Sequence, residues 1–173
     1  MVKVVVVPGR KAMILRMAAA ALGISAGLMV ALYFIGKKNW NIVFWGFFSA
    51  LWAVAALLLH IFYKRGKLAM YSSKLTSVIY TGIVGQVIGV IAFIVYIVLG
   101  AVHGDNLSNM ETTEFVASVW GFMTWKWAFV LWWYGRQYRH IVLEEALIPV
   151  EDDTTIVVEA DTNTVIKAPE VVA

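Results

Sequence analysis

Four long apolar stretches constrain this chain more than any other feature of its sequence. Each is long enough, at roughly 20 residues, to cross the hydrocarbon core of a bilayer as a helix. Of the 173 residues, 61% are hydrophobic and only 14% are charged, which is far more apolar than a soluble domain. We therefore predict an all-α, polytopic membrane protein. The four expected transmembrane helices cover about residues 13–35, 42–63, 77–101 and 115–138.

The lysines and arginines indicate how these helices are oriented, because positive charge is retained on the cytoplasmic side. Eleven of the fourteen lie in segments on one side, whereas only Lys37 and Lys38 lie on the other, and Lys126 lies within the fourth stretch. Both termini are therefore expected in the cytoplasm. We divide the chain into a four-helix transmembrane domain, 1–141, and an acidic cytoplasmic tail, 142–173. The β-branched residues of the tail fit either a small hairpin about residues 160–163 or a flexible segment.

Several classes of protein are excluded by what the sequence lacks. There is no cysteine, so disulfides and thiolate metal ligands are absent. No phosphate-binding loop predicts direct use of ATP, and no pair of histidines has the spacing of a zinc site. The basic residues form no stripe, so we do not expect a nucleic-acid partner. We predict a non-enzyme without catalytic residues.

Lys126 is unusual because a lysine at the centre of a membrane helix costs about 2.5–3.5 kcal/mol on insertion scales. It lies about 18 Å from either end of its expected helix, too deep for its side chain to reach water easily. One interpretation is that it pairs with a transported anion. The other is that it is neutral, or bonded to carbonyl, tyrosine or glutamine groups in the bundle. Trp125 and Trp127 flank it, which suits a flat, acidic aromatic ligand or, alternatively, ordinary packing against helices and lipid.

Two histidines lie close to ends of expected helices. His60 is one turn before the cytoplasmic end of the second, with Tyr63 on nearly the same face. His103 lies just past the exoplasmic end of the third. Imidazole and tyrosinate can both ligate haem iron. A hydrogen-bonding residue at the membrane interface is the alternative for each histidine.

The last expected helix contains the pattern Val-Trp-x-Phe-x-x-x-Lys-Trp-Ala-Phe at residues 119–129, followed by Tyr-Gly-Arg-Gln-Tyr at 134–138. The first pattern matches the core of the last helix in the haem-responsive gene (HRG) family of animal haem transporters, and the second resembles the aromatic and basic motif that follows that core. The second stretch is similar to the family's Leu-Trp…His…Tyr segment, which places its membrane histidine at His60. His103 matches the histidine of the loop before the last helix. The resemblance covers about residues 12–141, and it departs from the family where a Phe-Ala-Arg-Lys-Tyr-like motif loses one basic residue.

The resemblance implies a transporter that imports haem toward the cytoplasm, from outside the cell or from an endolysosomal lumen. His103 would receive haem on the exoplasmic side, and His60 would pass it on near the cytoplasmic end. Tyr134, Arg136 and Tyr138 would assist release or bind the propionates. The membrane would then be the plasma membrane or that of endosomes and lysosomes.

From the residues themselves we add Lys126 as an intermediate partner of the propionates and Tyr63 as a neighbour of His60. Haem is expected as the transported substrate, with His60 and His103 as iron ligands. A homo-oligomer, most simply a dimer, is expected because four helices enclose little space. Two alternatives stay open: an accessory membrane subunit that transports nothing, and a membrane oxidoreductase with permanently bound haem. The expected haem-binding residues are His60, Tyr63, His103, Lys126, Tyr134, Arg136 and Tyr138.

Overall fold

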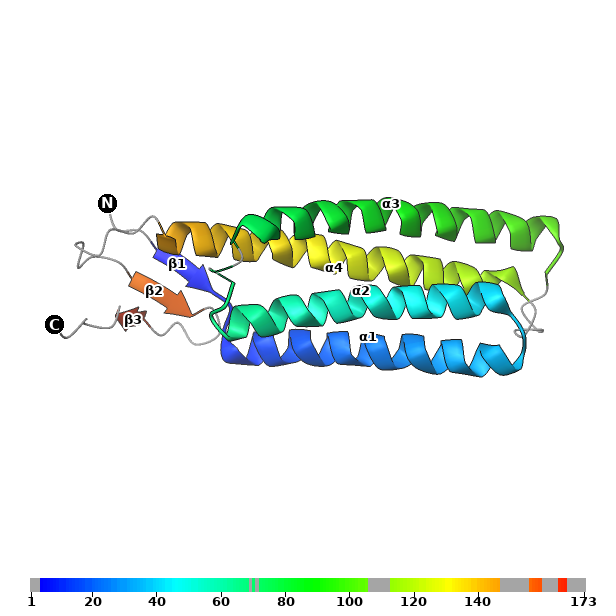
Figure 1. Cartoon of the computed structure of the whole chain (residues 1–173), viewed down its shortest axis with the longest axis horizontal. Helices are drawn as coiled ribbons and strands as arrows, with labels where there is room; N and C mark the ends of the chain where they lie inside the picture. Colours follow the sequence, from blue (N-terminus) through cyan, green and yellow to red (C-terminus); the bar gives the residue numbers. More distant parts are fainter. Residues whose placement is uncertain are drawn as a thin grey trace.

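Four long helices lie side by side as an up-and-down bundle in this computed structural model (Figure 1), which describes residues 4–68, 70, 72–105, 113–146, 156–159 and 165–167. The helices are α1 (Arg10–Gly36), α2 (Trp40–Lys64), α3 (Ser72–Val102) and α4 (Glu114–Ala146). Each contains the stretch expected from the sequence. We call the end where α1 begins and α2 ends the sheet end, and the opposite end the loop end.

The fourth helix is longer than expected, since it continues beyond 138 to Ala146. Ile141 and Val142 are the physical reason, because both are buried in the main core, at 4% and 8% exposure. The first proline after them is Pro149, so nothing in the sequence ends the helix earlier. The aromatic and basic segment therefore lies inside a helix rather than at its end.

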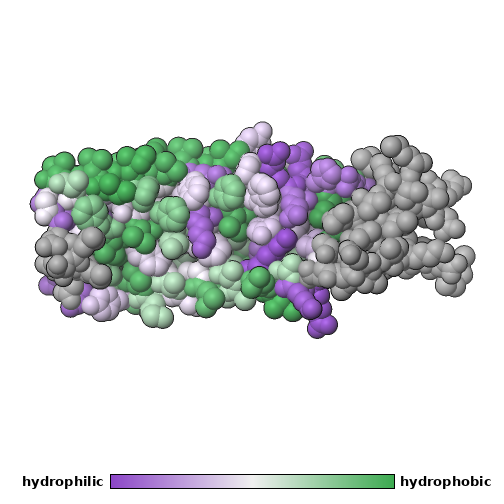
Figure 2. Space-filling view, turned by 180° about the vertical axis from the view of Figure 1, so that it is seen from behind, coloured by the Kyte–Doolittle hydropathy of each residue, from purple (hydrophilic) through white to green (hydrophobic). Residues whose placement is uncertain are grey.

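Three of the helices are long and apolar enough to cross a membrane: Arg10–Gly36, Trp40–Lys64 and Ser73–Val102. Large apolar side chains on their outer faces remain exposed, including Leu15 and Leu22 of α1 and Ile91 of α3. On the face shown in Figure 2, apolar surface covers most of the bundle, and hydrophilic groups gather toward the sheet end. Such a surface requires lipid. The chain is thus a multi-pass membrane protein.

The helix α4 does not meet the same measure of apolar composition, although it has 33 residues. Its tryptophans, tyrosines, lysine and arginines reduce its hydropathy. It nevertheless packs along both α3 and α2. The fourth membrane crossing and the cytoplasmic location of both termini therefore stay predictions.

Small residues set the distance between paired helices. A Cβ added to Gly27 of α1 would lie 2.7 Å from the carbonyl oxygen of Gly46 in α2. The two backbones are therefore in direct contact, as in many membrane helix pairs. A similar contact joins α3 to α4, where a Cβ on Gly89 would meet the backbone of Trp125. The bundle thus consists of two close pairs, α1–α2 and α3–α4, which meet through α2 and α4.

Within the described residues, a small sheet at the sheet end is the one departure from an all-α fold. Strand β1 (Val4–Val7) pairs in parallel with β2 (Ile156–Glu159), which pairs antiparallel with β3 (Val165–Lys167). Valine and isoleucine dominate these segments, and β-branched residues favour strands. Of the two interpretations left open for the tail, the antiparallel pairing of β2 and β3 corresponds to the hairpin, while its turn lies outside the described residues.

Candidate functional site

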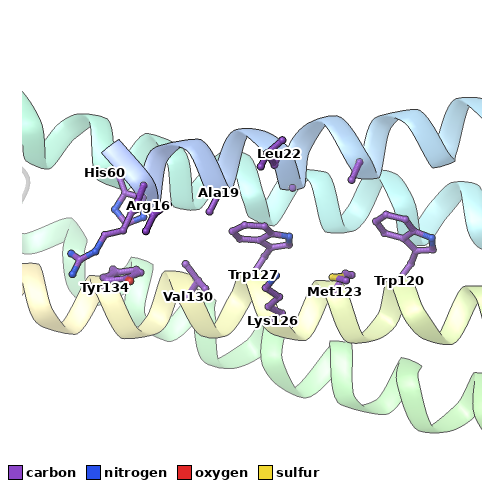
Figure 3. A pocket seen from close by; sticks show the side chains of 13 residues that line it. Arg16, Ala19, Leu22, His60, Trp120, Met123, Lys126, Trp127, Val130 and Tyr134 are labelled. Carbon is purple, nitrogen blue, oxygen red and sulfur yellow. The ribbon is translucent and has the colours of Figure 1, made fainter. Parts of the chain in front are cut away.

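A pocket of about 530 Å³ opens on the side of the bundle between α1 and α4 (Figure 3). It forms there because α1 packs mainly on α2, and α4 packs mainly on α3 and α2. Side chains rather than close backbones therefore fill the space between α1 and α4. Three residues expected to bind haem, His60, Lys126 and Tyr134, line this one pocket. The structure thus brings together groups from α2 and from two turns of α4.

His60 forms the inner wall of the pocket near the sheet end. It projects from the last part of α2 and is only 1% exposed. Its ring meets the ring of Tyr134 edge-on, with the centroids 4.9 Å apart. Its Nδ1 lies 2.8 Å from the hydroxyl oxygen of Tyr138. One nitrogen of the imidazole is therefore engaged by the protein, and Nε2 is the nitrogen that could bind a ligand.

Tyr138 is fully buried behind His60 and does not line the pocket. Its ring stacks on Tyr63 with centroids 4.1 Å apart and planes 7° apart. Its hydroxyl lies 3.8 Å from Met13 Sδ, toward which it can donate. When it does so, its oxygen accepts from Nδ1–H of His60, and Nε2 carries the free lone pair. Tyr138, stacked on Tyr63, therefore supports the His60 imidazole from behind the pocket, and the release role expected for Tyr138 stays a prediction.

Arg16 is the residue of this site that sequence reasoning missed. It was counted among the charges of the cytoplasmic side, yet it lies within the first expected span, and that position was the available signal. Its guanidinium carbon lies 4.4 Å above the centre of the Tyr134 ring. Its Nη1 donates a long hydrogen bond of 3.5 Å to the hydroxyl of Tyr138. Arg16 therefore joins the same cluster as His60, at the sheet end of the pocket (Figure 3).

Lys126 lies further along the pocket, toward its middle (Figure 3). Its ammonium is 5.1 Å from the centre of the Trp127 ring, and it forms no hydrogen bond with the described part of the chain. The described residues therefore do not show the alternative in which carbonyl, tyrosine or glutamine groups of the bundle form hydrogen bonds with this lysine. Trp127 is 6% exposed and lies against Gly23 of α1, where a Cβ would overlap the indole ring.

Arg136 is not part of this pocket. Its guanidinium lies over Trp132, with 5.3 Å between the guanidinium carbon and the ring centre. It lines a second surface hollow together with Trp133 and Gln137 of the same helix. The family resemblance grouped Tyr134, Arg136 and Tyr138 in one motif. Helical geometry separates Arg136 from the two tyrosines, because positions two apart do not share a face.

The end of α3 and the end of α2 lie at opposite ends of the bundle (Figure 1), so His103, which follows α3, is far from His60, which lies one turn before the end of α2. It is exposed in the turn that follows α3, where Gly104 has a φ of 66°. Next to it, Asp105 Oδ2 accepts a 2.7 Å hydrogen bond from the backbone nitrogen of Glu114, at the start of α4. Thr113 donates to the same oxygen at 3.3 Å. This turn is therefore anchored to α4, although residues 106–112 lie outside the description.

The separation of the two histidines bears on the oxidoreductase alternative. A permanently bound haem clamped by His60 and His103 of one chain needs both imidazoles at the same depth. They lie instead at opposite ends of the bundle. Within the described residues there is also no group of three or more His, Cys, Asp or Glu side chains that could hold a metal ion. The clamp is therefore ruled out within one chain.

Comparison with known proteins gives two likenesses. Residues 75–127 match the family described as haem-transporter, endosomal/lysosomal, haem-responsive gene. "Heme transporter hrg-1" of Caenorhabditis elegans is 32% identical over 146 residues, which cover 79% of this chain and 75% of that protein. No solved structure matches the chain. The family match includes Lys126 and Trp127, whereas it leaves out His60, Tyr134 and Tyr138.

Proposed function

Because this chain belongs to the haem-responsive gene family of haem transporters, we propose that it binds haem in the α1–α4 pocket and carries it toward the cytoplasm. The observation that carries the proposal is the convergence of His60, Tyr134 and Lys126 on one pocket. Haem is a flat, largely apolar ring system with an iron at its centre and two propionates at one edge. The pocket offers an imidazole for the iron, aromatic rings for the macrocycle and a cation for a propionate.

His60 is the proposed iron ligand, through Nε2. The hydrogen bond between Nδ1 and Tyr138 supports this role, since iron-binding histidines commonly donate their other nitrogen to a fixed partner. Tyr63 and Tyr138 would act as positioning residues. Tyr134 lies against the His60 ring and would contact the macrocycle.

Lys126 is the proposed partner of a propionate at mid-pocket. A lysine can be tolerated at this depth in the membrane if the substrate supplies its counter-ion. The bond to a carboxylate would then be charge-assisted and strengthened by the apolar surroundings. Its ammonium has no hydrogen-bonding partner among the described residues that would have to be displaced.

Direction follows from the proposed topology. With the sheet end in the cytoplasm, as the distribution of lysine and arginine favours, the exposed His103 would meet haem on the exoplasmic side. His60 would receive it close to the cytoplasmic end. The two histidines would thus act in sequence rather than together. The compartment would be the plasma membrane or, as the family description suggests, the endosomal and lysosomal membrane.

A second copy of the chain would complete the path. The pocket opens to the side of the bundle, where lipid would otherwise meet a bound haem. A homodimer with two-fold symmetry could cover two such openings with the same surface. An active protein that is strictly monomeric in detergent would contradict this part of the proposal.

Uptake by reconstituted protein tests the proposed function. The full chain in liposomes, loaded inside with a haem-binding reporter protein, should accumulate haem at a saturable rate, and His60→Ala should reduce that rate at least about tenfold. Exposed Lys67→Gln, outside the pocket, serves as the control. If wild-type liposomes take up no more haem than empty ones, the transporter function is wrong for the chain alone, and an accessory subunit becomes the better account.

A further inference from the structure

Arg16 is a half-buried cation that contacts only neutral groups in the described chain. The first 104 residues contain no aspartate or glutamate, so α1 and α2 supply no carboxylate. The contacts of its guanidinium are the Tyr134 ring and the Tyr138 hydroxyl. Glu144, on the same end of α4, is paired with His140 at 3.1 Å. In a membrane protein, a cation in this position is energetically unfavourable unless an anion binds to it.

The guanidinium is also placed to accept a carboxylate. Arginine has five N–H donors in a planar fork that matches the two oxygens of a carboxylate. One donor makes a bond of 3.5 Å to Tyr138, which is at the long limit for a hydrogen bond. Contact with the ring face of Tyr134 uses the charge but none of the N–H groups. Most of the donors are therefore available to a ligand in the pocket.

The remainder of the pocket indicates what kind of ligand this is. Beyond Arg16, His60 and Lys126 the lining is mostly apolar, with Val130 and Trp127 along α4 and Ala19 along α1 (Figure 3). A molecule that fills it would place an acidic group at the sheet end and an apolar, flat body toward Trp127. His60 lies beside the acidic end, since both it and Arg16 contact Tyr134.

We infer that Arg16 binds a carboxylate of the transported haem and so fixes which edge of the macrocycle enters the sheet end of the pocket. This inference rests on the proposed function. It makes α1 part of the binding site. Because both propionates lie at one edge of haem, Arg16 would take that edge after Lys126, which acts as the intermediate partner at mid-pocket. When a carboxylate takes the guanidinium, the Tyr138 hydroxyl loses that donor and keeps its bond to His60.

The test compares haem with its dimethyl ester, which keeps the iron and the macrocycle but has no carboxylate. Purified full-length protein is titrated with each ligand by Soret absorbance, as wild type, Arg16→Gln, Arg16→Lys and Arg65→Gln. Arg65 is exposed at the end of α2 and lies outside the pocket, so it controls for loss of a positive charge. Wild type should bind haem more tightly than the ester.

Arg16→Gln should weaken haem binding about tenfold, the usual effect of losing one charge-assisted bond, and leave ester binding unchanged. Arg16→Lys should recover part of the loss, and Arg65→Gln should behave as wild type. The Soret position should not move in any of these variants, because the iron ligand is intact. Unchanged ester binding also shows that Arg16→Gln is folded.

Two results would overturn the inference in distinguishable ways. If Arg16→Gln binds haem and ester as tightly as wild type does, Arg16 does not recognise the carboxylate, and the proposed function stands without it. If Arg16→Gln weakens both ligands equally, its role is structural. Absence of any saturable Soret shift in the wild type would remove the proposed function and this inference together.

Discussion

His60 at the sheet end and His103 at the loop end both lie close to a helix terminus, yet they are held in different ways. His60 is 1% exposed and is bonded to Tyr138, which is itself stacked on Tyr63. His103 is exposed in a turn and is placed by the backbone that leads into Asp105. The His60 imidazole is fixed by packed side chains, whereas the position of the His103 imidazole is determined only by the backbone.

This difference indicates how the work of a transporter could be divided between the two ends. A preorganised ligand pays little ordering entropy on binding and so favours affinity and a defined geometry. An exposed ligand exchanges easily with its surroundings and so favours capture. We therefore expect substitutions at the sheet end to change equilibrium binding, whereas those at the loop end should change it little.

The largest effect is expected where α1 meets the pocket. Gly23→Ala places a methyl group into the indole ring of Trp127, so either the ring moves into the pocket or α1 moves away. Haem affinity should fall about thirtyfold, equivalent to about 2 kcal/mol of overpacking strain, and the thermal midpoint should fall with it. Gly36→Ala, on the same helix at the loop end, has nothing within 4 Å of its new methyl group and is the matched control. Equal haem affinities in Gly23→Ala and Gly36→Ala would mean that the contact between Gly23 and Trp127 does not shape the haem site.

Removal of the Tyr138 hydroxyl, which bonds to His60, is expected to lower haem affinity about tenfold. Tyr138→Phe keeps the stack on Tyr63 but removes the partner of Nδ1. Loss of such a supporting bond commonly costs about 10- to 100-fold in metal affinity, and we expect the lower limit here. Haem titration with Tyr33→Phe, an exposed tyrosine toward the loop end of α1, as control would check this. If Tyr138→Phe binds haem as wild type does, the imidazole is not held through this bond.

Lys126→Met should have a smaller effect, because the lysine lies at mid-pocket and its only described ring contact is Trp127. Methionine keeps a similar length and removes the charge. The rate of haem uptake should fall about fivefold, as expected for one charge-assisted bond in a partly open site. Lys37→Met, at the loop end, is the matched control. Wild-type uptake in a Lys126→Met protein that reaches the membrane would mean that this lysine is not a propionate partner.

The smallest effect on binding is expected at the loop end. Asp105→Ala removes the acceptor for the Glu114 backbone nitrogen and should cost about 1 kcal/mol, as loss of a helix cap does. The thermal midpoint should therefore fall. Haem affinity should stay within about twofold of the wild-type value, since the free-energy effects of changes at distant sites are independent. A large loss of haem affinity would show that the two ends are coupled.

Much of the architecture could be predicted from the sequence, because the apolar stretches and the distribution of charge determine where helices run. The individual residues of the site could be predicted as candidates, and His60, Lys126 and Tyr134 do line one pocket. That these residues line the same pocket could not be predicted, since it depends on which helices pack closely. Arg16 was assigned to the cytoplasmic charges because nothing in α1 alone shows that it faces Tyr134.

Two further differences have separate physical causes. Arg136 was grouped with its neighbours in sequence, but a rotation of 200° over two helical positions takes it to another face from Tyr134. The strand β1 was missed because a run of four valines at one terminus pairs with a segment about 150 residues away. Such long-range pairing cannot be derived from either segment by itself.

The most direct test of the central claim is the Soret spectrum and haem affinity of purified His60→Ala beside His103→Ala. We expect His60→Ala to lose the imidazole-type Soret shift and to bind haem at least about tenfold more weakly. We expect His103→Ala to keep the wild-type spectrum and an affinity within about twofold of wild type. An unchanged spectrum in His60→Ala, or its loss in His103→Ala, would contradict the claim that haem binds in the α1–α4 pocket through His60.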